Sequence, residues 1–213
     1  VDNSLHSYLN VQKQLNTLGV NFCSVKMSII QEDGKEVISI NDNAGGIHEK
    51  DFERLLSIGI QKERTDIQLS EFGMGMKTAG IWFADTIEIR TKKLGESQEV
   101  RTTIDIPSFV SGNAVLEVHT TAKPVDQHYT IIELRNLKRK LGRAAFSKMR
   151  QHLGSIYRGD LRSGNLNLVV NDEPVELPLD KSDDAFLLRS NGTPYVVEIK
   201  DIVINGKKVS GWI

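Results

Sequence analysis

The most informative stretch of the sequence is 37–47, where an apolar run ends on a single carboxylate and two glycines follow. The run is rich in β-branched residues, which favour a strand, and it stops at Asp42. Gly45 and Gly46 have no Cβ, so the backbone can turn there and a flat ligand can approach closely. A carboxylate fixed at a strand end can accept a hydrogen bond from an exocyclic amine, which separates adenine from guanine. Taken alone, Asp42 is more typical of an aspartate that caps a turn after a strand.

A second glycine-rich segment, 71–80, has the form of a phosphate site. It reads Glu-Phe-Gly-Met-Gly-Met-Lys-Thr-Ala-Gly and runs into a helical pattern. Glycines let successive backbone N–H groups point into one cavity, and the N-terminus of the following helix adds partial positive charge. Lys77 can reach a phosphate oxygen. The Walker A pattern is absent from the sequence, and an isolated Gly-x-Gly-x-Lys is just as typical of a flexible turn.

The first residues of the chain include Asp2, Asn3 and Ser4. An amide oxygen such as that of Asn3 suits Mg²⁺, a hard cation that keeps several of its waters when it binds a protein. The same three residues are also common at the N-cap of a helix. Both interpretations stay open on the residues alone.

The elements that would position these segments follow from the hydrophobic periodicity. Residues 1–18 predict an amphipathic helix ended by Gly19, and 22–30 and 36–41 predict two strands joined by an Asp-Gly turn. Beyond them we expect a helix over 48–57, a loop over 58–72, a helix over 77–84, strands over 86–91, 98–106, 114–121 and 128–135, a helix over 143–157, and a β-rich tail from 165. This order predicts an α+β sandwich, with a mixed or antiparallel sheet and its helices on one face.

In this order and spacing, the three segments resemble the boxes of the GHKL ATPases, the superfamily of gyrase B, heat-shock-90 chaperones, histidine kinases and MutL. The form of 72–80, Phe-Gly-x-Gly-x-Lys-x-x-Gly, is most similar to that of the MORC ATPases and their bacterial relatives. The resemblance covers about residues 1–160 and implies a Bergerat-type two-layer sandwich that binds ATP with Mg²⁺. Ala44 stands where these families usually have the first glycine of Asp-x-Gly-x-Gly.

The resemblance also implies roles for single residues. Asp42 would bind the adenine amine and share a water with Thr130 on a distant strand, and Asn3 would help coordinate Mg²⁺. The glutamate that polarises the attacking water in hydrolysing members would lie two residues before Val1, so no catalytic residue is assigned. The implied ATP-binding set is Asn3, Ser7, Asp42, Gly46, Ile47, Gly73, Met74, Gly75, Met76, Lys77 and Thr130, with Asn3 as the metal ligand.

By the same resemblance, we expect a GHKL-type ATP-binding domain over 1–162, truncated at its N-terminus. The start of a β-rich, transducer-like domain would follow over 163–213. In such clamp-like proteins ATP binding closes a lid, here 58–72, and brings two modules together. We therefore expect an ATPase that acts within a larger protein and forms an ATP-dependent homodimer.

Composition restricts the partners. Of the 213 residues, 39% are hydrophobic and 26% are charged, as in an ordinary globular protein. No apolar run approaches the roughly 20 residues that span a bilayer, so we expect no membrane partner and a cytoplasmic protein, or a nuclear one in a eukaryote. The segment 135–162 holds nine basic residues and a single acid, Asp160. It predicts either a solvated helix face or a surface that binds nucleic acid.

Three other functions remain open on the sequence. One is a histidine-kinase-type catalytic domain, which the lysine of the glycine loop and the long β-rich tail disfavour. Another is a module that senses nucleotide without hydrolysing it, which a non-acidic residue at the upstream glutamate position would favour. The last is an α+β domain without a nucleotide.

Overall fold

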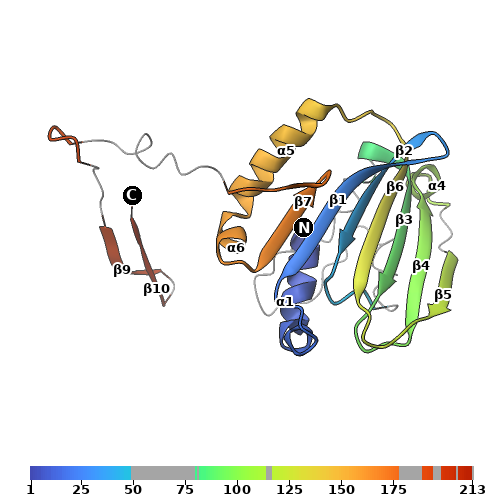
Figure 1. Cartoon of the computed structure of the whole chain (residues 1–213), viewed down its shortest axis with the longest axis horizontal. Helices are drawn as coiled ribbons and strands as arrows, with labels where there is room; N and C mark the ends of the chain where they lie inside the picture. Colours follow the sequence, from blue (N-terminus) through green and yellow to red (C-terminus); the bar gives the residue numbers. More distant parts are fainter. Residues whose placement is uncertain are drawn as a thin grey trace. The chain divides into compact units, whose positions relative to one another are not determined.

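A computed structural model describes residues 1–48, 80, 82–113, 117–177, 189–193, 198–204 and 206–212. The chain divides into two compact units, Val1–Glu176 and Leu177–Ile213. The first unit is built on one eight-stranded sheet, whose strands follow the order β5-β4-β3-β6-β2-β1-β7-β8 (Figure 1). The strands are β1 (Cys23–Glu32), β2 (Lys35–Asp42), β3 (Ala84–Lys92), β4 (Gln98–Asp105), β5 (Glu117–Ala122), β6 (Tyr129–Leu137), β7 (Leu166–Val170) and β8 (Glu173–Pro174).

The sheet is antiparallel except for the pairing of β1 with β7, which is parallel. The β1–β2 hairpin turns at Asp33 and Gly34, both with positive φ, as the Asp-Gly signal predicts. Strand β6 comes late in the sequence but inserts between β2 and β3. This insertion matters for the site, because it places Thr130 directly opposite Asp42.

One face of the sheet is covered by helices. The helices that the structure describes in full in the first unit are α1 (Asp2–Thr17), α4 (Ile106–Val110), α5 (Arg143–Ile156) and α6 (Arg158–Arg162). Figure 1 shows α1 behind the sheet. Leu5 and Tyr8 of α1 and Phe146 of α5 belong to the same buried cluster as Val25 of β1 and Leu168 of β7. The period-two alternation of burial in β7 and β4 turns apolar side chains to this covered face.

A second buried cluster fills the other half of the sheet. Ile38, Leu134, Ile87 and Ile104 lie opposite one another across β2, β6, β3 and β4, and Ile106 of α4 packs with them. The same register, four residues further along β2, brings polar side chains to the covered face. The fold therefore leads from an apolar row directly to a polar one.

Most elements agree with the sequence expectations. The predicted helices 1–18 and 143–157 and the strands over 22–30, 36–41, 98–106 and 128–135 are confirmed within one or two residues. The expected strand at 114–121 begins at Glu117 among the described residues. Strand β3 begins at Ala84, which the sequence pattern predicts as the end of a helix. The loop over 58–72 and all but His48 of the helix expected over 48–57 lie outside the described residues. Of the helix expected over 77–84, Gly80, Trp82 and Phe83 are described and helical.

The tail differs in its organisation from the expectation. Strands β7 and β8 belong to the large sheet, because β7 pairs along its length with β1, so the first compact unit extends to Glu176 rather than to residue 162. In the second unit, β9 (Glu198–Ile204) and β10 (Lys207–Trp212) form an antiparallel pair. Among the described residues, no helix is both long and apolar enough to cross a membrane.

Candidate functional site

Asp42 is the last residue of β2, and its carboxylate is held by hydrogen bonds at both oxygens. The Ser4 hydroxyl of α1 donates to Oδ2 at 2.7 Å, and the backbone N–H of Ala44 donates to Oδ1 at 3.0 Å. The first bond fixes the carboxylate relative to the helix, and the second is the local bond expected of an aspartate that precedes a turn. Asp42 therefore caps the turn, and it also faces the covered side of the sheet; its role as the acceptor for a ligand amine stays a prediction.

Asp42 belongs to a polar row that crosses three neighbouring strands. Asp42 lies opposite Thr130 on β6, and Thr130 lies opposite Thr91 on β3. Directly opposed residues point to the same face of a sheet, so the three side chains lie on the helix-covered face. Thr91 is 0% exposed and Thr130 6% exposed, and their hydroxyl oxygens are 3.1 Å apart. The row therefore offers one carboxylate and two buried hydroxyls side by side.

Burial raises the pKa of the Asp42 carboxyl above its usual value. Hydrogen bonds from Ser4 and from the backbone of Ala44 and Thr130 favour the charged form and oppose that shift. A carboxylate that is both desolvated and held in place is a strong acceptor for a neutral N–H donor of a ligand. The electrostatics of the site thus suit an amine better than a second anion.

The glycine segment after Asp42 is pressed against β3. Gly46 has φ +74°, and a Cβ added to it would lie 2.2 Å from the carbonyl oxygen of Lys92. Two hydrogen bonds fasten the segment there: the Ile47 N–H donates to Thr91 Oγ1 and the Leu94 N–H donates to the Gly45 carbonyl, both at 3.0 Å. Only glycine fits at position 46, and the segment borders the Asp42–Thr130–Thr91 row.

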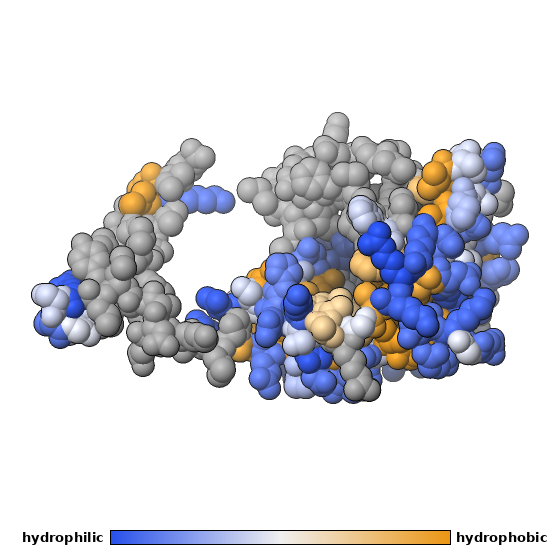
Figure 2. Space-filling model, turned by 90° about the horizontal axis from the view of Figure 1, so that it is seen from above, coloured by the Kyte–Doolittle hydropathy of each residue, from blue (hydrophilic) through white to orange (hydrophobic). Residues whose placement is uncertain are grey.

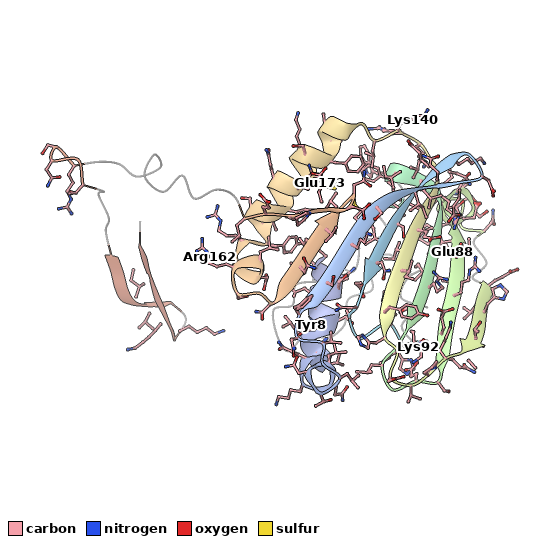
Figure 3. All side chains as sticks on the ribbon, in the orientation of Figure 1. Tyr8, Glu88, Lys92, Lys140, Arg162 and Glu173 are labelled. Atoms are coloured by element: carbon pink, nitrogen blue, oxygen red, sulfur yellow. The ribbon has the colours of Figure 1, made fainter. Side chains whose placement is uncertain are left out.

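Lys92 reinforces the same edge from the opposite face of β3. Its side chain, labelled in Figure 3, is completely buried, and its ammonium donates to the carbonyls of Lys93, Glu96 and Gln127. Burial lowers the pKa of this lysine. These bonds tie the β3–β4 turn to the loop before β6, so the strand end that supports Gly46 is locally rigid.

Helix α1 approaches the glycine segment closely. The hydroxyl of Ser7 donates to the Gly46 carbonyl at 3.4 Å, and a Cβ at Gly45 would lie 2.6 Å from Cγ2 of Val11. Val11 has non-helical backbone angles, φ −121° and ψ 15°, so the helix is kinked where the glycines pass. The predicted site residue Ser7 is therefore brought to the predicted segment at Gly46 and Ile47.

The residues at the start of α1 do not cap it. Val1 is the N-cap and makes no side-chain capping bond, so the N-cap alternative for Asp2, Asn3 and Ser4 is wrong. Asp2 accepts a 2.6 Å hydrogen bond from the Tyr157 hydroxyl, which joins α1 to the end of α5. Asn3 is exposed within the first turn, one residue before Ser4, whose hydroxyl donates to Asp42. Its role as a metal ligand stays a prediction.

The predicted phosphate residues lie outside the described residues. They are Gly73, Met74, Gly75, Met76 and Lys77. Among the residues that the structure does describe, no cluster of three or more His, Cys, Asp or Glu side chains has the geometry to hold a metal ion.

Three residues of the site were not predicted from the sequence. Ser4 had a signal, since it directly follows Asn3. Thr91 had none, because its meeting with Thr130 depends on the order β3-β6-β2, which the sequence does not reveal. His128 also had none: its Nδ1 lies 2.8 Å from the carbonyl oxygen of Asn43, which can only accept, so this nitrogen bears the proton.

Comparison with known proteins agrees with this geometry. Residues 1–136 match the model of a family described as histidine kinase-, DNA gyrase B- and HSP90-like ATPases. The chain belongs to this family. The match contains Asp42, Thr130, Thr91 and the α1 residues, so every described part of the site lies within it. No curated protein sequence matches the chain significantly.

Among solved structures, this chain is similar to the ATPase regions of type II topoisomerases. The ATPase region of Saccharomyces cerevisiae topoisomerase II is 15% identical with a TM-score of 0.54, over 80% of this chain and 48% of that one. The same region bound to ICRF-187 (dexrazoxane) gives 14% identity and 0.57, over 93% and 55%. The ATPase and transducer domains of topoisomerase II from Balamuthia mandrillaris give 13% and 0.52, over 82% and 48%. The chain thus has the mixed α+β fold of these ATPases and spans about half of their length.

Proposed function

We propose that the first unit binds ATP through its adenine, with Asp42 as the residue that recognises the base. The observation that supports this most directly is the row of Asp42, Thr130 and Thr91 beside the glycine segment, inside the region that matches the ATPase family. The ionised carboxylate accepts a hydrogen bond from the adenine N6 amine. Guanine presents a carbonyl oxygen at that position, and two acceptors repel each other.

Mg²⁺ fits the residues at the start of α1. A single amide oxygen, that of the exposed Asn3, is a suitable protein ligand, because Mg²⁺ on a nucleotide takes its other ligands from phosphates and water. When bound, the ion neutralises phosphate charge. Asp2 is already engaged with Tyr157, so we assign the coordination to Asn3 and not to its neighbour.

The remaining parts of the proposal rest on the sequence resemblance. The segment Gly73–Lys77 binds the phosphates, loop 58–72 closes over them as a lid, and two modules of a longer MORC-like protein dimerise when ATP is bound. The second unit is the start of a transducer-like domain, which the β9–β10 hairpin fits. Hydrolysis needs a general base, the glutamate expected before Val1. A non-hydrolysing nucleotide sensor and a histidine-kinase-type catalytic domain are the alternatives.

Isothermal titration of the chain with a non-hydrolysable ATP analogue and Mg²⁺, beside the GTP analogue, tests the proposal. We expect adenine-selective binding that Asp42→Asn abolishes, because the amide presents a donor in place of one acceptor. Asp172→Asn is the matched control, since Asp172 is exposed and forms only a surface ion pair with Lys26. Equal affinity for both nucleotides, or unchanged binding by folded Asp42→Asn, would overturn the proposal.

A second candidate function, nucleic-acid binding, is favoured by the charge of 135–162. Arg135 and Arg150 are not available for it, because they form ion pairs with Glu32 and Glu173. Lys140, Lys148 and Arg158 are exposed along α5, α6 and the loop before them. Figure 3 shows Lys140 in the loop before α5. Hydrophilic residues also dominate much of the described surface seen from above (Figure 2).

A gel-shift titration with duplex DNA at several salt concentrations tests this second function. The expected result is binding that weakens steeply as salt increases and that is reduced when Lys140, Lys148 and Arg158 are changed together to glutamine. The absence of a shift at low salt would exclude a nucleic-acid surface on this chain.

A further inference from the structure

Thr91 has three hydrogen-bonding neighbours, and their chemistry restricts how its single proton is used. Its Oγ1 lies 3.0 Å from the Ile47 N–H, 3.0 Å from the Tyr129 carbonyl oxygen and 3.1 Å from Thr130 Oγ1. A hydroxyl donates one hydrogen bond and accepts two. The Ile47 N–H can only donate and the Tyr129 carbonyl can only accept. All three contacts are satisfied together only when Thr91 donates to Tyr129 and Thr130 donates to Thr91.

The alternative arrangement reverses the bond between the two threonines. If Thr91 donates to Thr130, it gives up the Tyr129 carbonyl, and the proton of Thr130 becomes free to point elsewhere. The two arrangements differ by about one hydrogen bond, so ligand binding can switch between them. Thr91 is completely buried, so water does not compete for its contacts.

The base to be bound requires the second arrangement. Adenine presents an N6–H donor next to the N1 acceptor. Asp42 supplies the acceptor for N6, so the group that meets N1 must donate a hydrogen bond. If a water lies between Thr130 and N1 and donates to both N1 and Asp42, that water in turn accepts from Thr130. Thr130 lies directly opposite Asp42 in the sheet and is the hydroxyl placed for this. It can donate to N1 and keep its hydrogen bond with Thr91 only when Thr91 has become the donor of the pair.

We propose that Thr91 is a positioning residue for base specificity: by donating to Thr130 it turns the Thr130 proton toward N1 of adenine. The proposal rests on the adenine site proposed above. Thr91 acts through Thr130 and does not touch the base. Because Thr91 also accepts from Ile47, the orientation of the proton is coupled to the position of the glycine segment that borders the pocket.

The test compares two nucleotides that differ only at N1. ATP and 1-deaza-ATP, in which N1 is replaced by C–H, are titrated by calorimetry into the wild-type chain, Thr91→Val and Thr91→Ser. We expect the wild type to prefer ATP by about tenfold or more. Thr91→Val should reduce this preference to within about twofold, and Thr91→Ser should restore it, since serine retains the hydroxyl.

The ratio of the two affinities separates this role from a structural one. A variant that only loosens the pocket weakens both nucleotides equally and leaves the ratio unchanged. Thr102→Val is the matched control, because Thr102 is also 0% exposed and donates only to the Glu117 carbonyl on the neighbouring strand, at 2.8 Å. Its ratio should equal that of the wild type.

The outcomes also separate this proposal from the adenine site itself. If folded wild type binds neither nucleotide, both proposals fall. If it binds ATP with an N1 preference that Thr91→Val retains, or binds both nucleotides equally, the role of Thr91 is refuted and the adenine site stands.

Discussion

Replacing Gly46 by alanine tests whether the close contact between the glycine segment and β3 shapes the pocket. Gly34 in the β1–β2 turn is a matched control, because its φ of +75° is nearly the same as the +74° of Gly46. An added Cβ costs about 1–2 kcal/mol in this left-handed conformation at either position. At Gly34 nothing lies within 4 Å of the added atom, so we expect no further cost there and unchanged ATP affinity.

At Gly46 the same Cβ would lie 2.2 Å from the Lys92 carbonyl, where real contacts are longer than 3.0 Å. The segment must therefore move by about 1 Å, which weakens the bonds of Ile47 to Thr91 and of Gly45 to Leu94, each contributing about 0.5–1.5 kcal/mol. We expect Gly46→Ala to lower the free energy of unfolding by about 2–5 kcal/mol and the ATP affinity by at least tenfold, or about 1.4 kcal/mol.

Urea unfolding and calorimetric titration with a non-hydrolysable ATP analogue measure both quantities on the same samples. The calorimetric titration is done in buffer without urea, in which each variant is folded. If Gly46→Ala and Gly34→Ala lose the same stability and bind the nucleotide as the wild type does, the packing of this segment does not shape the pocket.

Three further perturbations follow from the groups around Asp42. Burial raises the pKa of the Asp42 carboxyl above 3.8, so the folded chain binds the proton of this carboxyl more tightly than the unfolded chain does. The stability that this protonation contributes is therefore present below pH 3.8 and is lost as the pH rises through the folded pKa. ATP affinity, which needs the carboxylate, should change in the opposite direction and fall as pH decreases through that pKa; parallel titrations of stability and affinity would contradict this assignment. Ser4→Ala removes a 2.7 Å bond to the charged carboxylate and should cost about 1.5–3 kcal/mol of unfolding free energy, measured by urea unfolding, with weaker ATP binding; a neutral effect on both would show that the bond is dispensable. Burial raises the pKa of the Cys23 thiol to about 12, so iodoacetamide at pH 7.5 should label it, by mass spectrometry, only after denaturation, and rapid labelling of the folded chain would refute the burial.

Much of the fold was predictable because its signals are local. The Asp-Gly turn, the two strands beside it and the alternation of apolar residues all lie within a few neighbouring positions. Asp42 could be predicted for the same reason, because the β-branched run, the carboxylate and the two glycines all lie within the eleven residues 37–47. Thr130 followed from the family resemblance and was brought opposite Asp42 by the sheet register.

What the sequence could not provide is the pairing of distant strands. The parallel partner of β1 is β7, which lies far along the chain, so the extent of the first unit was underestimated. The contact of Thr91 with Thr130 likewise arises from the insertion of β6 between β2 and β3. No local pattern marks a threonine as a hydrogen-bond partner when its partner is selected by the order of the strands.

The most direct test of the central claim is a crystal structure of this chain with a non-hydrolysable ATP analogue and Mg²⁺. The account predicts that the adenine N6 lies within hydrogen-bonding distance of the Asp42 carboxylate and that N1 faces Thr130, directly or through one water. A base bound elsewhere, or one whose amine does not face Asp42, would contradict it.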